Sequence, residues 1–83
     1  MKFDRVRDIH TKEDLADFIR EFREGLVLNP DDWENPSLES FLAAMEIWIR
    51  SIDMYAKNSG DSDVVSPSWR TFAKILCASK VYE

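Results

Sequence analysis

Large apolar residues recur at alternating spacings of three and four through the middle of the chain. Such spacing places them on one helical face, which a small protein buries. They are Leu38, Phe41, Leu42, Met45, Trp48, Ile49, Ile52 and Tyr55. Asn35 can cap this helix, and Pro36 suits a first turn that needs no backbone donor. The pattern predicts a helix over about 36–57, roughly 30 Å long, on which the rest of the chain packs.

A shorter helical pattern precedes it. Thr11 begins the run T-K-E-D, which resembles a capping box with Asp14 in place of the usual Glu or Gln. The apolar residues after it share one helical face. They are Leu15, Phe18, Ile19, Phe22 and Leu26. We therefore predict a helix over about 12–27, which ends near Asn29-Pro30.

A third helical pattern closes the chain. Ser66 and Pro67 have the same order of capping residue and proline as the central helix, which predicts a helix over about 67–80. Its apolar face is formed by Trp69, Phe72, Ala73, Leu76 and Cys77. We expect Lys74 and Lys80 to lie on the outside, Lys80 near the C-terminal end where the helix dipole favours cations, and Trp69 to pack on the central helix.

Three helices with short connections predict a compact all-α fold, an up-down-up three-helix bundle. We expect residues 1–83 to form a single helical domain. Residues 1–10 leave two alternatives open, a short extra helix or an arm tucked under the core, and we favour an irregular arm. The loops 29–34 and 58–66 then lie at opposite ends of the central helix.

Charge is unevenly spread along the chain. The net charge is −5, and residues 13–46 hold ten acids against two arginines. An acidic middle argues against binding to nucleic acid or an anionic membrane, and it favours a basic partner or simple solubility. Cys77 is the single cysteine, and no signal peptide or membrane-spanning run is visible. We expect a soluble protein of the cytoplasm.

The candidates for chemistry are few. His10 and Cys77 are the only residues of their types, too few for a zinc site, and no glycine-rich loop could cradle a phosphate. Acids gather at 31–34 and 61–63 but lack the ligand spacing of a calcium loop. We expect no catalytic residues, no metal and no cofactor, although paired carboxylates remain conceivable in any acidic protein.

The acids suggest a partner-binding surface instead. A stripe on the first helix runs towards acids in the following turn, where Trp33 stands among polar residues. The residues are Asp17, Glu21, Glu24, Asp31, Asp32 and Trp33. The acids are either solvated charges or a surface that meets a basic one. Trp33 either closes the end of the bundle or anchors an interface, where Trp is enriched among binding hot spots.

From Trp33 onward the chain resembles a family of small uncharacterised bacterial domains. The pattern is W-E-N at 33–35, L-x-x-F-L-x-A-x-x-x-W-I at 38–49, S-W-x-x-F-A-x-x-L at 68–76 and Y-E at 82–83, and D-L-A-D-F-I at 14–19 also fits. This resemblance implies a fold and carries over no catalytic residue. In size and charge the chain also resembles bacterial immunity proteins, which neutralise a toxin made by a neighbouring cell.

These observations predict a non-catalytic protein-binding module. We expect an immunity or antitoxin type of protein that occludes a toxin enzyme, such as a nuclease, by presenting its acids to a basic cleft. One alternative is a homo-oligomeric structural domain, because three amphipathic helices can leave an apolar edge that a homodimer covers. The other is a small metal-binding enzyme that uses Asp31, Asp32 and Glu34.

Overall fold

The structure, a computed structural model, describes residues 6–82. These residues form an all-α fold, and no strand occurs among them. The α-helices are α1 Lys12–Leu28, α2 Leu38–Arg50, α3 Ile52–Ser59 and α4 Trp69–Val81, and the short 3-10 turns are η1 Val6–Asp8, η2 Pro30–Asp32 and η3 Ser62–Val65. The N-terminal region is thus a 3-10 turn at Val6–Asp8, and the remainder of our prediction for residues 1–10 falls on 1–5, outside the described residues.

The first predicted helix is confirmed as α1, together with its capping box. The hydroxyl of Thr11 accepts a hydrogen bond from the Asp14 backbone N–H at 3.1 Å. The Asp14 carboxylate in turn accepts from the backbone N–H groups of Thr11, at 3.2 Å, and His10, at 3.0 Å. Because those bonds favour the charged carboxylate, the His10 N–H foremost, they lower the pKa of Asp14.

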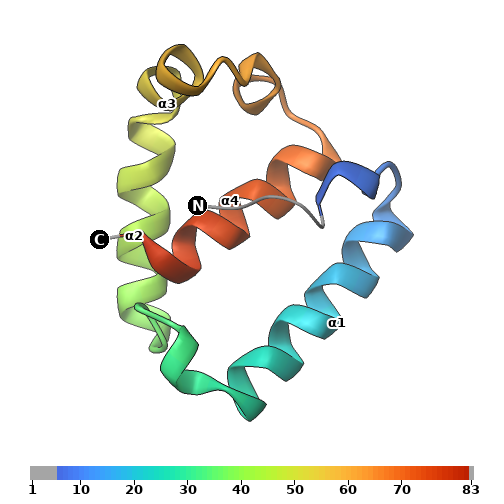
Figure 1. The fold of residues 1–83 in the computed structure, drawn as a ribbon, viewed down its shortest axis with the longest axis vertical. Helices are drawn as coiled ribbons and strands as arrows, with labels where there is room; N and C mark the ends of the chain where they lie inside the picture. The colour runs from blue at the N-terminus through green and yellow to red at the C-terminus, as the bar shows by residue number, and fades with distance from the viewer. Residues whose placement is uncertain (1–5, 83) are drawn as a thin grey trace.

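The predicted single helix over 36–57 is wrong, since the chain breaks at Ser51 into α2 and α3. The Ser51 N–H bonds to the carbonyls of both Ile47 and Trp48, which tightens the last turn of α2. Beyond the break, the Tyr55 ring tilts against Trp48 with ring centroids 5.3 Å apart. The count of three helices is therefore not met, and α3 turns away to pack on η3 (Figure 1).

Both predicted caps are displaced by two residues. Ser37, and not Asn35, caps α2 by accepting the N–H of Ser40. Ser68, and not Ser66, caps α4 in the same way. Each true cap directly follows a proline, whose fixed backbone disfavours a helical conformation in the preceding residue.

The centre of the fold is α4, and not the predicted central helix. In Figure 1 α4 runs between α1 and α2, and it contacts both of them as well as η1 and η3. Small residues make this possible, because Ala73, Ala78 and Ser79 are completely buried along it. Side chains of that size let neighbouring helices approach closely from two sides.

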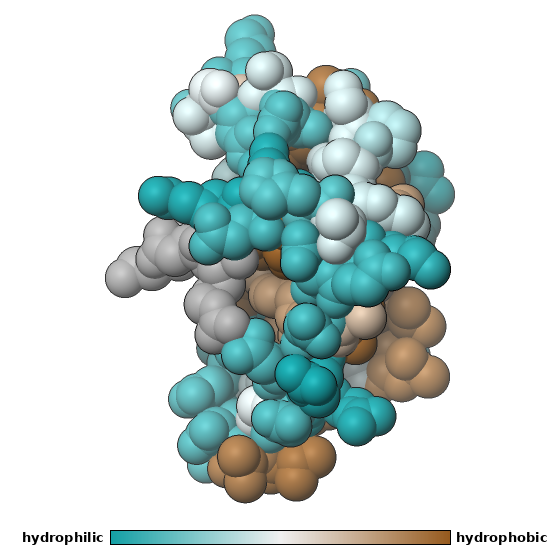
Figure 2. Space-filling model, turned by 90° about the vertical axis from the view of Figure 1, so that its right-hand side faces the viewer, coloured by the Kyte–Doolittle hydropathy of each residue, from teal (hydrophilic) through white to brown (hydrophobic). Residues whose placement is uncertain are grey.

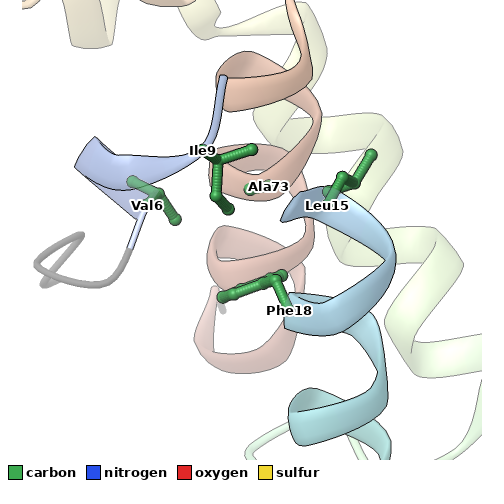
Figure 3. Close-up of a cluster of buried hydrophobic side chains, with 5 residues drawn as sticks. All are labelled: Val6, Ile9, Leu15, Phe18 and Ala73. Atoms are coloured by element: carbon green, nitrogen blue, oxygen red, sulfur yellow. The ribbon is translucent and has the colours of Figure 1, made fainter. Parts of the chain in front are cut away.

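Two separate apolar clusters lie on either side of α4. The first joins η1 and α1 to Ala73 through Val6, Ile9, Leu15 and Phe18 (Figure 3). The second surrounds Ala78 with Trp48, Val64 and partly buried residues of α3 and α4. Because α4 lies between them, α1 and α2 pack mainly on α4, and they meet each other at Phe22 and Phe41, whose ring centroids are 6.3 Å apart.

Polar side chains of α4 fasten η3 and the loop around it. The Thr71 hydroxyl lies 2.7 Å from the Ser66 carbonyl oxygen and 3.1 Å from that of Asp63. The Lys74 ammonium lies 2.6 Å from the Asp61 carboxylate, and the Lys74 side chain is only 9% exposed. Our placement of Lys74 on the outside is therefore wrong, because this ion pair draws it beneath the loop.

Candidate functional site

The acids predicted to bind a partner lie at the surface. Asp17, Glu21 and Glu24 follow one flank of α1, and Asp31 and Asp32 belong to η2, which packs against α1. All five are exposed. Asp17 makes a long ion pair with Arg20 at 3.8 Å. We call these five residues the acidic face.

Trp33 is separated from this surface because its side chain is buried. It is 8% exposed and tilts against Phe22, with ring centroids 4.6 Å apart, and against Phe41 at 6.0 Å. The Lys80 ammonium lies 5.3 Å from the centre of the Trp33 ring, a cation–π contact. Trp33 thus joins α1, α2 and the end of α4, as the bundle-closing alternative describes.

Asn35 closes the same end of the fold by holding the last carbonyls of α4. Its side-chain amide donates to the carbonyl oxygens of Ser79, at 3.1 Å, and Tyr82, at 2.6 Å. Its backbone N–H donates to the carbonyl of Lys80 at 3.1 Å. The last carbonyls of a helix have no partner within it, so Asn35 supplies partners from a distant segment.

An apolar groove of about 330 Å³ opens between α1 and the start of α2. Ile19 and Leu26 form the α1 wall, Leu38 forms the α2 wall, and Phe41 and Leu76 lie deeper. Leu38 is 74% exposed although its position in the apolar pattern predicted burial. We call this feature the apolar groove.

Apolar stripes extend this groove along two helices. On α2, Leu42 and Ile49 are about half exposed and follow Leu38 at helical spacing. On α4, Trp69 and Phe72 are also partly exposed and precede Leu76 on its face. Trp69 contacts Phe72, with ring centroids 6.0 Å apart, and its packing on the central helix stays a prediction. Figure 2 looks onto the α1 side and shows apolar surface at the lower end and along one edge, beside hydrophilic areas.

A second cavity, of about 440 Å³, opens where η1 meets the start of α4. Arg70 crosses it, with one guanidinium nitrogen 3.1 Å from Asp63 and another 3.1 Å from His10 Nδ1. Because arginine can only donate, His10 accepts through Nδ1. Asp63 and His10 thus hold the Arg70 guanidinium between η3 and the segment that follows η1.

No set of three or more His, Cys, Asp or Glu side chains in residues 6–82 is placed to hold a metal ion. The acids at 31–34 and those at 61–63 lie at different ends of α4, beside its C-terminus and its N-terminus respectively. Within the described part of the chain, no helix is long and apolar enough to cross a membrane.

A protein-family model matches residues 11–83, nearly the whole chain. The chain belongs to a family of unknown function, DUF7660. The resemblance to an uncharacterised family of small helical domains is thereby confirmed. Searches of curated proteins and of solved structures find no match.

The fold explains why distant parts of the sequence pattern occur together. Trp33 and Asn35 of the W-E-N run meet the end of α4, at Lys80 and at Tyr82 of the closing Y-E. We call these contacts between the W-E-N run and the end of α4 the clasp.

The apolar groove was missed at the sequence level, but a signal for it exists. Adjacent apolar pairs, Phe41-Leu42 and Trp48-Ile49, widen the stripe of α2 beyond the arc that one neighbouring helix covers. The inner member of each pair packs inward, and Leu42 and Ile49 stay exposed.

Proposed function

We propose that this protein is a non-catalytic protein-binding module that meets a basic partner through its acidic face. The observation that supports it is the exposure of five carboxylates on one flank of α1 and the adjoining η2. Glu24, Asp31 and Asp32 form no ion pair among the described residues, so their charge is available to a partner.

The narrower form of the proposal is an immunity or antitoxin protein of bacterial origin. A toxin that cleaves nucleic acid has a basic cleft, and a rigid row of carboxylates can occupy it in place of phosphates. In this proposal the acidic face is the contact surface, and the buried Trp33 side chain supports its η2 end from beneath.

Electrostatic attraction of this kind has a measurable signature. The purified protein is immobilised as bait, and the proteins that it captures from a lysate of the source organism are identified by mass spectrometry. We expect one stoichiometric partner with a basic catalytic domain, whose association slows as salt rises. Inhibition of that partner's activity by the purified protein would then be assayed directly.

Charge reversal tests the surface. Replacing Glu24 and Asp32 with Lys should slow association and speed dissociation, whereas Asp53→Lys, an equal charge change per site on α3, should leave binding nearly unchanged. Unchanged affinity of the Glu24/Asp32 variant for the captured protein would sink the assignment.

The homo-oligomeric domain is a second candidate, and the exposed apolar groove is the observation that favours it. The small metal-binding enzyme that uses Asp31, Asp32 and Glu34 has less support, because these acids are solvent-exposed and do not form a metal-holding group among residues 6–82. A rise of Tm with divalent cations would support metal binding by the protein, and an unchanged Tm would contradict it.

A further inference from the structure

The apolar groove and its stripes form a surface that the fold leaves without a partner. Six large apolar side chains there are between roughly two-fifths and three-quarters exposed. They are Ile19, Leu38, Leu42, Ile49, Trp69 and Phe72. Ile19 and Leu38 line the groove itself, and Leu42 and Ile49 follow Leu38 along α2. Trp69 and Phe72 line the second cavity, on the face of α4 that leads to Leu76 in the groove. We call these six side chains the valley.

The exposed area is what one side of a stable interface needs. Half-exposed side chains of these types contribute on the order of 50–100 Å² each, so the valley offers on the order of 500 Å² of apolar surface. A standard interface takes about 800 Å² from each partner, a little over half of it non-polar. A typical monomer exposes a largest patch of about 300–600 Å², and that patch is often functional.

Charges beside the groove differ in sign. Arg23 lines the groove on the α1 wall. Glu39 is exposed and directly follows Leu38, the groove-lining residue in the first turn of α2. Neither residue has an ion-pair partner among residues 6–82. An occupant of the groove should therefore carry an acid opposite α1 and a base opposite α2.

A second copy of this chain meets both requirements. A two-fold axis along the groove places α1 of each copy opposite α2 of the other at the same level, because rotation about an axis preserves position along it. Arg23 would then face Glu39 of the partner subunit, and the same contact would occur twice.

We propose that the apolar groove is a self-association surface and that its occupant is a second copy of this chain, with α1 of each copy against α2 of the other. The inference rests on the groove and not on the acidic face. Glu21 lines a different, smaller cavity with Gly25 and Lys80, which places the acidic flank of α1 away from the groove. A dimer therefore presents two acidic faces to solvent.

Sedimentation equilibrium of the purified chain tests the proposal. Standard-size interfaces reach micromolar affinity or better, so data up to about 0.5 mM cover the range. We expect a mass that rises with concentration to twice the 9.7 kDa of one chain. A monomer throughout would overturn the proposal and assign the groove to a different protein.

A matched pair of substitutions locates the interface. Leu38→Asp puts a charge into the groove, and Met54→Asp puts the same charge on α3; both sites are well exposed and lie in the first turn of a helix, where an acid is tolerated. We expect Leu38→Asp to raise the dimer Kd at least tenfold, and Met54→Asp to leave it within a factor of two. Equal changes of the dimer Kd in the two variants would show that the groove is not the interface.

A charge exchange tests the orientation. Arg23→Glu and Glu39→Arg should each weaken the dimer, because each places like charges opposite one another. The double variant restores opposite charges and should bind more tightly than either single variant. If the double variant is weaker than both, the α1-to-α2 orientation is wrong. Circular dichroism of every variant checks that the fold is kept.

Discussion

Replacing Asn35 should separate its role at the end of α4 from any role as an N-cap of α2. Asn35→Ala removes two side-chain hydrogen bonds, to the carbonyl oxygens of Ser79 and Tyr82, and keeps the backbone bond to Lys80. At about 0.5–1.5 kcal/mol for each net hydrogen bond, we expect a loss of roughly 1–3 kcal/mol. A chain of 83 residues has a total stability of about 4–12 kcal/mol, so the loss is large.

The stability of the Asn35→Asp variant relative to Asn35→Ala decides between the two roles. Aspartate is a good N-cap, so an N-cap role would keep the stability. At the C-terminal end of α4 a carboxylate instead faces carbonyl oxygens and the negative end of the helix dipole, which costs about 0.3–1 kcal/mol more than alanine. We therefore expect the stability order Asn, then Ala, then Asp at pH 7.

Urea unfolding followed by circular dichroism measures these differences. With an m-value of about 1 kcal/mol/M for a chain of this size, the Asn35→Ala midpoint should fall by about 1–3 M. Asp and Ala should converge as pH falls below about 4, because a protonated carboxyl can donate again. An Asp variant as stable as the wild type at pH 7 would refute the clasp.

Three further predictions concern single groups. Asp61→Ala removes the carboxylate that lies 2.6 Å from the buried Lys74 ammonium and should lower the free energy of unfolding in urea by roughly 2–4 kcal/mol. Asp61→Ala with Lys74→Met should cost less than the sum of the single changes. Asp14 has a lowered pKa in the folded state, so its contribution is present above its ordinary value of 3.8 and is lost as pH falls; Asp14→Asn should flatten the fall of Tm below pH 4, and an unchanged slope would contradict this. Burial raises the pKa of the Cys77 thiol from 9.0 to about 11, so alkylation at pH 8 should be about 100-fold slower than in urea-unfolded chain; equal rates would show an accessible thiolate.

The sequence pattern determined where helices form, but not how they assemble. Thr11 and Asp14 lie three residues apart and act locally, so the start of α1 could be predicted to the residue. The break at Ser51 could not, because Ile52 and Tyr55 continue the apolar spacing and only their packing on Val64 turns α3 aside. Apolar periodicity shows which face is buried, and not which partner buries it.

The position of α4 also depends on long-range contacts. The apolar pattern placed Ala73 on the inner face of this helix and did not single out Ala78, although the small size of both lets two helices pack on α4. Lys74 looked external because charge predicts exposure, and the Asp61 carboxylate overrides that rule. For the candidate site, the exposed positions of the acids followed from helical spacing, whereas the groove depends on how far α1 and α2 are held apart.

The most direct test of the proposed function is one capture experiment with three baits. Wild-type chain, a variant with Glu24, Asp31 and Asp32 changed to Lys, and the Asp53→Lys control are immobilised at equal density and exposed to the same lysate of the source organism. We predict one stoichiometric basic protein on the wild-type and Asp53→Lys baits, and its loss from the bait with the reversed acidic face. Equal recovery on all three baits, or no partner on the wild type, would contradict the account.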